Sequence, residues 1–178
     1  MVKWIVAFAF LIWPTELNKR EPLVMSIEPK HFRELIIRPT LRLYAIDGVE
    51  LLSPDSEELL MLTGAQETHL GRWLRQNGID GNYAPGRGPY SMEPNTYYWL
   101  QSKFPTLLKG SADQLVWDLR LATLAARLRY WVVREALPSR HDWRAMAIYW
   151  DVYYNGNPNH GTPEEAVSNY KRYALGKG

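Results

Sequence analysis

Apolar residues recur every three to four positions over most of this chain, which is the spacing of one face of an α-helix. Patterns that alternate between apolar and polar residues, as in a half-buried strand, are sparse. The periodicity, together with the signals that start helices, predicts helical segments near residues 30–44, 54–76, 94–104, 112–137, 143–153 and 163–174. The chain is therefore expected to be mainly α-helical.

The helical pattern breaks at residues 77–87, where Gly78, Gly81, Pro85 and Gly86 are typical of turns. This segment has room for a small β-hairpin, and no larger sheet is predicted. With 178 residues, of which 46% are hydrophobic and 22% charged, the chain suits a single globular domain. We assign that domain to residues 25–178.

The predicted helix at 112–137 divides its residues between two faces. Arg127, Arg129 and Arg134 fall outside the apolar face and are expected on the solvated side. The apolar face is made of Leu115, Leu119, Ala122, Ala126, Tyr130 and Val133. We therefore expect this helix to pack in the centre of the fold.

The predicted helix at 54–76 carries a carboxylate close to its apolar stripe. Ser53 suits the N-cap, Pro54 suits the first helical position, and acidic residues follow in the first turn. Glu67 comes seven residues after Leu60 and so lies nearly on the apolar face, which also carries Leu70. Its carboxyl is expected to be partly desolvated.

A partly desolvated carboxyl can keep its proton near neutral pH, and a glycosidic oxygen needs such a proton as its bond breaks. Glu67 is therefore a candidate general acid. The plain alternative is a solvated helix glutamate, which is the commonest situation for this residue type.

The segment from Gly88 to Thr96 has the features of a cleft lip. Gly88 allows close approach of the backbone, and Pro94 starts the next helix. Tyr90 and Met92 supply flat and soft surface of the kind that contacts sugar rings. We predict that Gly88, Tyr90 and Met92 bind substrate.

These motifs resemble the lytic transglycosylase branch of the lysozyme superfamily. That branch has Glu-Ser at a helix end, then Gly-Leu-Met-Gln-x-x-Pro-x-Thr, then Tyr-Asn-Ala-Gly. The counterparts, in the same order, are Glu67-Thr68, residues 88–96 and Tyr154-Asn155-Gly156. The chain is similar, more closely, to small tailed-phage proteins of lysozyme type over residues 32–41, 66–71 and 154–165.

Two positions depart from the family pattern. Thr68 replaces the usual Ser, so a hydroxyl remains there. Ser91 stands where the family usually has Gln. Loss of the longer amide leaves either a water-filled gap or a different substrate contact at position 91.

The resemblance implies a lysozyme-like fold that cleaves the β-1,4 bond between N-acetylmuramic acid and N-acetylglucosamine in peptidoglycan. It implies that Glu67 protonates the bridging oxygen and then, as carboxylate, deprotonates the muramic C6 hydroxyl, which closes a 1,6-anhydro ring. It also implies that Tyr154 and Asn155 point into the cleft and hold the sugar acetamides and Glu67. Without the resemblance, these two residues simply end a helix before Gly156.

A hydrolytic lysozyme would need a second carboxyl, about 5 Å from the first for retention or roughly 6.5 to 9.5 Å for inversion. Asp80 and Glu93 are the available acids. An aspartate in a glycine-rich loop is more often a turn former, and an acid before a helix more often caps it electrostatically. The anhydro-forming and hydrolytic outcomes both stay open.

The composition bears on nucleic-acid binding and on metal or cofactor sites. The 21 basic and 19 acidic residues are interspersed and sum to a net charge of +2, which gives no case for nucleic-acid binding. With no cysteine and four scattered histidines, neither a thiolate site nor a zinc site is supported. No metal and no cofactor are predicted.

Residues 1–24 form an apolar N-terminal extension in this interpretation. Its apolar run is too short to cross a bilayer straight, so no stable membrane span is predicted. The extension is either a signal peptide, a segment before a second start at Met25, or a segment that docks on partner subunits.

Two functions of different class follow. The first is a phage peptidoglycan glycosidase that is carried in the virion and acts in the host periplasm or at the cell wall. The second is a catalytically weak or inactive lysozyme-like structural protein of the virion, which docks on tail or portal subunits through residues 1–24.

Overall fold

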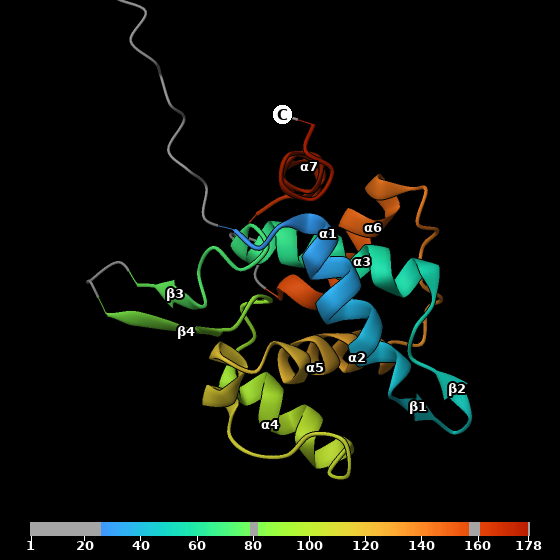
Figure 1. The fold of residues 1–178 in the computed structure, drawn as a ribbon, viewed down its shortest axis with the longest axis vertical. Coiled ribbons are helices and arrows are strands. Elements are labelled where there is room, and N and C mark those ends of the chain that lie inside the picture. Colours follow the sequence, from blue (N-terminus) through green and yellow to red (C-terminus); the bar gives the residue numbers. More distant parts are fainter. Residues whose placement is uncertain (1–25, 79–81, 157–160, 178) are drawn as a thin grey trace, which may run out of the picture.

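The computed structural model describes residues 26–78, 82–156 and 161–177, so the predicted extension at 1–24 lies outside the described part of the chain. The described residues form one small, mainly helical domain with two short hairpins (Figure 1). The predictions of a mainly α domain and of a small sheet content are confirmed. In chain order the elements are α1 Pro29–His31, η1 Phe32–Ile37, α2 Arg38–Arg42, β1 Ala45–Ile46, β2 Val49–Glu50, α3 Pro54–Thr68, β3 Arg75–Asn77, β4 Tyr83–Arg87, α4 Pro94–Lys103, η2 Ala112–Val116, α5 Leu119–Trp131, α6 Trp143–Trp150, η3 Asp151–Asn155, α7 Pro163–Asn169 and η4 Tyr170–Ala174.

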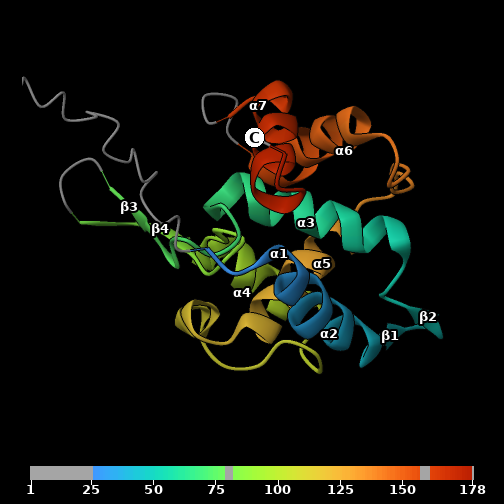
Figure 2. The same ribbon diagram turned by 45° about the horizontal axis from the view of Figure 1, so that its top comes forward.

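Helices α3 and α5 run through the middle of the domain (Figures 1 and 2). Helix α3 packs on α6 and α7 on one side and on α5 on the other, while α5 also contacts α2 and α4. Both central helices are buried along most of their length. In this arrangement the two ends of α3 come out on opposite sides of a shared core, and one of these ends carries Glu67.

The start of each long helix follows its local signals. At α3 the Ser53 hydroxyl accepts a hydrogen bond from Ser56 N, with Pro54 in the first turn. At α7 the Thr162 hydroxyl accepts from Glu165 N in the same way. These caps satisfy backbone N–H groups that have no partner inside a helix. The predicted helices at 94–104, 143–153 and 163–174 are accordingly found.

The predicted helix at 54–76 is wrong at its end, because α3 stops at Thr68. His69, Leu70 and Gly71 all adopt left-handed backbone conformations, with φ values of 51°, 57° and 78°. The N–H groups of His69 and Leu70 bond back to Ala65 O and to Gly64 O, which closes the helix. Leu70 is fully buried, so the apolar pattern continues past a helix that has already ended.

The predicted helix at 112–137 is also divided. The turn η2 ends before Trp117, and Asp118 then caps α5 by accepting from Leu121 N at 2.9 Å. Helix α5 ends at Trp131. A capping aspartate inside an otherwise periodic stretch is the local reason for the break.

The expected solvated position of Arg127 is wrong. This side chain is 5% exposed, and its Nε donates to Leu51 O at 2.9 Å. Its guanidinium lies over the ring of Trp131, and burial lowers the pKa of Arg127 to about 10. Arg127 therefore ties α5 to the segment that leads into α3.

Two antiparallel hairpins border the helices. Strands β3 and β4 pair around the segment predicted as a hairpin, with Arg75 opposite Arg87. Strands β1 and β2 were not predicted, although Asp47-Gly48 between them is a typical two-residue turn with positive φ at both positions. Within the described residues, no helix combines the length and apolarity needed to cross a bilayer.

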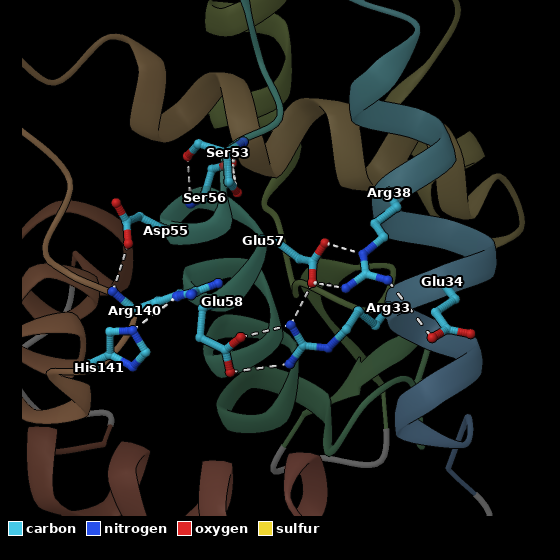
Figure 3. A network of polar contacts seen from close by, with 10 residues as sticks. All are labelled: Arg33, Glu34, Arg38, Ser53, Asp55, Ser56, Glu57, Glu58, Arg140 and His141. Atoms are coloured by element: carbon cyan, nitrogen blue, oxygen red, sulfur yellow. Dashed lines mark hydrogen bonds and ion pairs between the residues drawn. The ribbon is translucent and has the colours of Figure 1, made fainter.

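A network of arginines and glutamates joins the N-terminal helices to the start of α3 (Figure 3). Arg33 Nη1 donates to Glu57 Oε1 at 2.6 Å and to Glu58 Oε2 at 2.7 Å. Arg38 Nε donates to the second oxygen of Glu57 at 2.6 Å. Glu57 is 7% exposed, so its carboxylate is held by two guanidinium groups in a largely dry setting.

We expect the substitution Glu57→Gln to lower the free energy of unfolding by about 2–3 kcal/mol, because it leaves two arginines facing an uncharged group. Denaturant unfolding measures this change. The matched control is Glu34→Gln, since Glu34 is exposed and lies 3.8 Å from Arg38, and it should change stability by less than about 0.5 kcal/mol. Equal effects from the two substitutions would contradict the role given to Glu57.

The same network predicts a loss of stability in acid. Burial by itself would raise the pKa of Glu57, but hydrogen bonds from Arg38 and Arg33 outweigh it and lower the pKa. A carboxylate whose pKa is lower in the folded state stabilises the fold above the pKa of the unfolded chain, about 4.3. This contribution disappears as the pH falls through the lowered value, and Glu57→Gln should remove that part of the pH dependence.

Candidate active site

A cavity of about 970 Å³ opens at the C-terminal end of α3. Its walls come from the end of α3, the hairpin β3–β4, the turn before α4, and η3, with α5 and the start of α7 also contributing. The lining mixes carboxyl, amide and hydroxyl groups with the rings of Trp73, Trp150 and Tyr154. A groove with aromatic walls and a few polar groups is the usual form of a small-molecule or glycan site.

Glu67 lies in the wall of this cavity as the last residue but one of α3. Burial raises the pKa of Glu67 to about 7, although a hydrogen bond from Trp150 opposes the rise. A helix C-terminus also disfavours negative charge, which acts in the same direction as burial. Near neutral pH the carboxyl is therefore protonated in a large share of molecules, as a general acid requires.

Trp150 fixes the orientation of this carboxyl. Its Nε1 donates to Glu67 Oε1 at 2.9 Å, and the indole is 1% exposed at the end of α6. No hydrogen bond among the described residues reaches the second oxygen, Oε2, so that oxygen is the one available to a ligand. Sequence reasoning missed Trp150, which is 83 positions from Glu67 and carries no local signal.

The hydroxyl of Thr68 connects the end of α3 to the turn at 88–91. Thr68 Oγ1 donates to Pro89 O at 2.6 Å and accepts from Gly71 N at 2.8 Å. Both bonds need a hydroxyl on a short side chain, which Ser and Thr share. The departure from Ser at position 68 therefore leaves the attachment of this turn intact.

Gly88 and Tyr90 are not among the residues that line the cavity, so the structure does not bring these two predicted substrate-binding residues to the groove. Gly88 has a φ of 71°, and an added Cβ would collide with Leu115 O, so its missing side chain serves close packing within the fold. Tyr90 is 1% exposed and packs on Phe32, with ring centroids 5.8 Å apart. Its ring anchors the turn in the core instead of offering a surface to sugars.

Met92 and Ser91 do line the cavity. Met92 is 4% exposed and its backbone pairs with Arg87, which holds the segment against β4. Gly86 has no side chain, and an added Cβ there would collide with Ser91 Oγ and approach Gln76 Oε1 at 2.8 Å. The amide of Gln76 therefore lies in the neighbourhood of the Ser91 hydroxyl.

Tyr154 and Asn155 lie in the cavity wall at the end of η3, as predicted from the third motif. Tyr154 Oη donates to Tyr90 O at 2.9 Å, and Asn155 Nδ2 donates to Asp151 Oδ1 at 3.0 Å. Burial raises the pKa of Tyr154 well above 10, with a further increase from the charge of Glu67. Tyr154 thus acts as a proton donor in hydrogen bonds and not as a base.

Further acids are present at the groove. Glu93 and Glu165 both line the cavity and are exposed. Sequence reasoning considered Glu93 and missed Glu165, which follows the cap of α7. Asp80, the other acid considered, lies outside the described residues. In the part of the chain that the structure describes, no cluster of three or more His, Cys, Asp or Glu side chains is placed to hold a metal ion.

Other lining residues were also missed. Trp73 is 39% exposed at the cavity, with the guanidinium of Arg72 5.0 Å from its ring centroid. Gln66 also lines the cavity, and its Oε1 accepts from Asn169 Nδ2 at 2.8 Å. The general abundance of aromatic residues was the one signal for Trp73, and it does not separate a cleft residue from a core residue.

The fold and the site define a small α-helical domain with a protonatable carboxyl in an aromatic groove. Comparison of the chain with protein-family models, with curated proteins and with solved structures gives no match. The function is therefore argued from the geometry of the groove and from the motifs of the sequence.

Proposed function

We propose that this protein is a peptidoglycan glycosidase of phage type, a lytic transglycosylase or lysozyme with a lysozyme-like fold. The observation that carries the proposal is Glu67, a carboxyl with a pKa of about 7 in the wall of a large groove. Met92, Tyr154 and Asn155 line the same groove, and all three lie in segments that resemble the motifs of that family.

In the proposed reaction Glu67 Oε2 gives its proton to the oxygen between N-acetylmuramic acid and N-acetylglucosamine. The bond from that oxygen to the muramic C1 breaks, and positive charge develops on the ring. Trp150 holds the other carboxyl oxygen, so the proton lies on the side that faces the groove. Once it is deprotonated, the carboxylate is stabilised by the same Trp150 N–H.

Two nucleophiles can then attack the muramic C1. If the carboxylate of Glu67 removes the proton of the C6 hydroxyl, that oxygen attacks C1 and a 1,6-anhydro ring closes. If water attacks instead, a second carboxyl activates it or occupies the opposite face. Glu93 and Glu165 are the further acids at the groove in the described chain.

The proposed setting is a virion that meets the cell wall of its host. The partner is a glycan strand of peptidoglycan, with no metal or cofactor in the chemistry. Tail or portal subunits are proposed as partners of residues 1–24, which lie outside the described structure.

Purified wall sacculi test the proposal directly. The protein should release soluble fragments, and the mass of each fragment distinguishes an anhydro end from a hydrolysed end, which is heavier by one water. Absence of any release by well-folded protein, at every pH between 5 and 8, would reject the enzyme and favour the structural virion protein.

Trp73 is expected to contribute ring surface to sugar binding, because it is 39% exposed and lines the groove. The substitution Trp73→Ala should raise KM for wall fragments by about tenfold with little change in kcat, since it removes ring contacts made equally with the bound substrate and the transition state. Steady-state kinetics on soluble strands measures KM and kcat separately. Trp117→Ala is the matched control, since Trp117 is 64% exposed and does not line the cavity. A larger effect from the control would contradict this role.

A further inference from the structure

Arg129 is a half-buried cation in the wall of the groove, and it has no acidic partner in the described chain. No carboxylate of residues 26–78, 82–156 or 161–177 lies within 4.0 Å of its guanidinium, whereas Arg75 and Arg87 share Asp113 at 3.1 and 2.7 Å. Among the described lining residues Arg129 is the one basic side chain. A partly desolvated cation without an acidic partner is stabilised most by an anionic group that the ligand brings.

The guanidinium also lies near an aromatic ring. It lies 5.9 Å from the ring centroid of Trp99, which projects from the neighbouring helix α4. An aromatic face on one side leaves the in-plane N–H groups of an arginine free, and these form the fork that matches a carboxylate. Arg129 itself lines the cavity, so its guanidinium is in reach of a ligand there.

The charge of Arg129 is not used by the catalytic carboxyl. Burial and the Trp150 hydrogen bond set the pKa of Glu67, and Arg129 does not contribute. Its charge acts instead on Tyr154, so the guanidinium is within electrostatic reach of another residue of the groove wall. Glu93 and Glu165 repel anions at the other described positions of the lining, so an anionic group is favoured beside Arg129.

On the basis of the proposed function, we infer that Arg129 binds a carboxylate of the substrate, so that the groove selects carboxylate-bearing glycan strands over neutral ones. Peptidoglycan offers this group from two sources. One is the carboxylates of the stem peptide, and the other is the lactyl carboxylate of muramic acid once the peptide has been removed. Arg129 is thereby a specificity-determining residue that acts outside the bond-breaking step.

The test compares three soluble strand preparations: intact strands, strands whose carboxylates are converted to neutral amides, and strands stripped of their peptides by an amidase. The wild type, Arg129→Gln and Arg120→Gln are assayed on each. Arg120 lies on the same helix, is exposed and does not line the cavity, so its substitution matches the change in charge. Thermal unfolding of each variant shows that it is folded.

We expect the wild type to prefer intact over neutralised strands by about tenfold in kcat/KM, the value of one charge-assisted hydrogen-bonded pair. Arg129→Gln should lose this preference and match the wild type on neutralised strands, while Arg120→Gln should keep it. A preference that persists on stripped strands assigns the lactyl carboxylate, and one that vanishes there assigns the stem peptide.

The inference is overturned if the wild type shows no preference or if Arg129→Gln keeps it. Equal losses on all three strands would also overturn it, because they would indicate a structural role. Affinities for the same strands are measured in parallel by calorimetry. If no strand is cleaved, the proposed function fails, and the binding preference still decides the role of Arg129.

Discussion

The substitution Glu67→Gln is expected to reduce the cleavage of peptidoglycan by roughly 10³-fold, within the range of 10² to 10⁴ that a positioned general acid supplies. The amide has nearly the same shape as the protonated carboxyl and still accepts the hydrogen bond from Trp150 Nε1. It has no acidic proton to give to the glycosidic oxygen. The loss should therefore appear in kcat, with KM nearly unchanged.

Release of soluble fragments from sacculi, measured as initial rates, checks this expectation. The matched controls are Glu93→Gln and Glu165→Gln, which alter the other described carboxyls of the groove. If the reaction forms an anhydro product, both controls should retain activity within about tenfold, since no second carboxylate takes part. A control as inactive as Glu67→Gln would indicate hydrolysis assisted by that residue. Full activity of Glu67→Gln itself would refute the mechanism.

The substitution Trp150→Phe is expected to move the pH profile of kcat/KM, which reports the free enzyme, to higher pH by about one unit, the size of one hydrogen bond to a charged group. Activity requires the protonated carboxyl, so the wild-type rate should fall as the pH rises through about 7. The indole N–H stabilises the carboxylate, and its removal raises the pKa of Glu67 further. The pH at which the rate falls on the alkaline side is therefore higher in the variant than in the wild type.

Rates at several pH values on soluble strands measure the shift. Trp143→Phe is the matched control, because Trp143 belongs to the same helix α6 and does not line the groove. Its profile should coincide with that of the wild type. If Trp150 had only a structural role, its substitution would lower the rate at every pH without shifting the pH at which the rate falls. That result would contradict the claim that its hydrogen bond lowers the pKa of Glu67.

The beginnings of the helices were predictable because their signals are local. Ser53 with Pro54, and Thr162 with Pro163, identify the first turns of α3 and α7 within a few residues of sequence. The amphipathic periodicity then supplies the helix that follows. The helical content of the domain rests on these short-range effects.

The ends of the helices were less predictable. Leu70 is buried and keeps the helical spacing, although α3 has ended at Thr68 through left-handed residues. Leu70 is not a residue type that indicates a left-handed conformation, His69 indicates one only weakly, and Gly71 comes after both. Packing around Leu70 and the bond from Gly71 N to the Thr68 hydroxyl decide the end, and both depend on the folded structure.

The site was predictable where a motif carried it. Glu67 was predicted from its place on an apolar helix stripe, Met92 from its soft side chain, and Tyr154 and Asn155 from the family resemblance, and all four line one cavity. The assignment of the cavity to peptidoglycan remains a proposal, as does the lysozyme-like fold.

The remaining site residues depend on three-dimensional contacts. Tyr90 was expected in the cleft but is buried on Phe32, because an aromatic side chain looks the same in sequence whether it faces a core or a ligand. Trp150 reaches Glu67 from a different helix. Arg129 was expected in solvent, and its helix instead turns it into the groove beside Trp99.

The protonation of Glu67 in the free protein is the quantity on which the mechanism depends. It can be followed through the chemical shift of the side-chain carboxyl carbon in protein labelled with ¹³C-glutamate, with Glu67→Gln used to assign the signal. The structure predicts a titration midpoint of about 7 for this carbon. A midpoint near the ordinary glutamate value, about 4.3, would show an ionised carboxylate at neutral pH and would contradict the general-acid role.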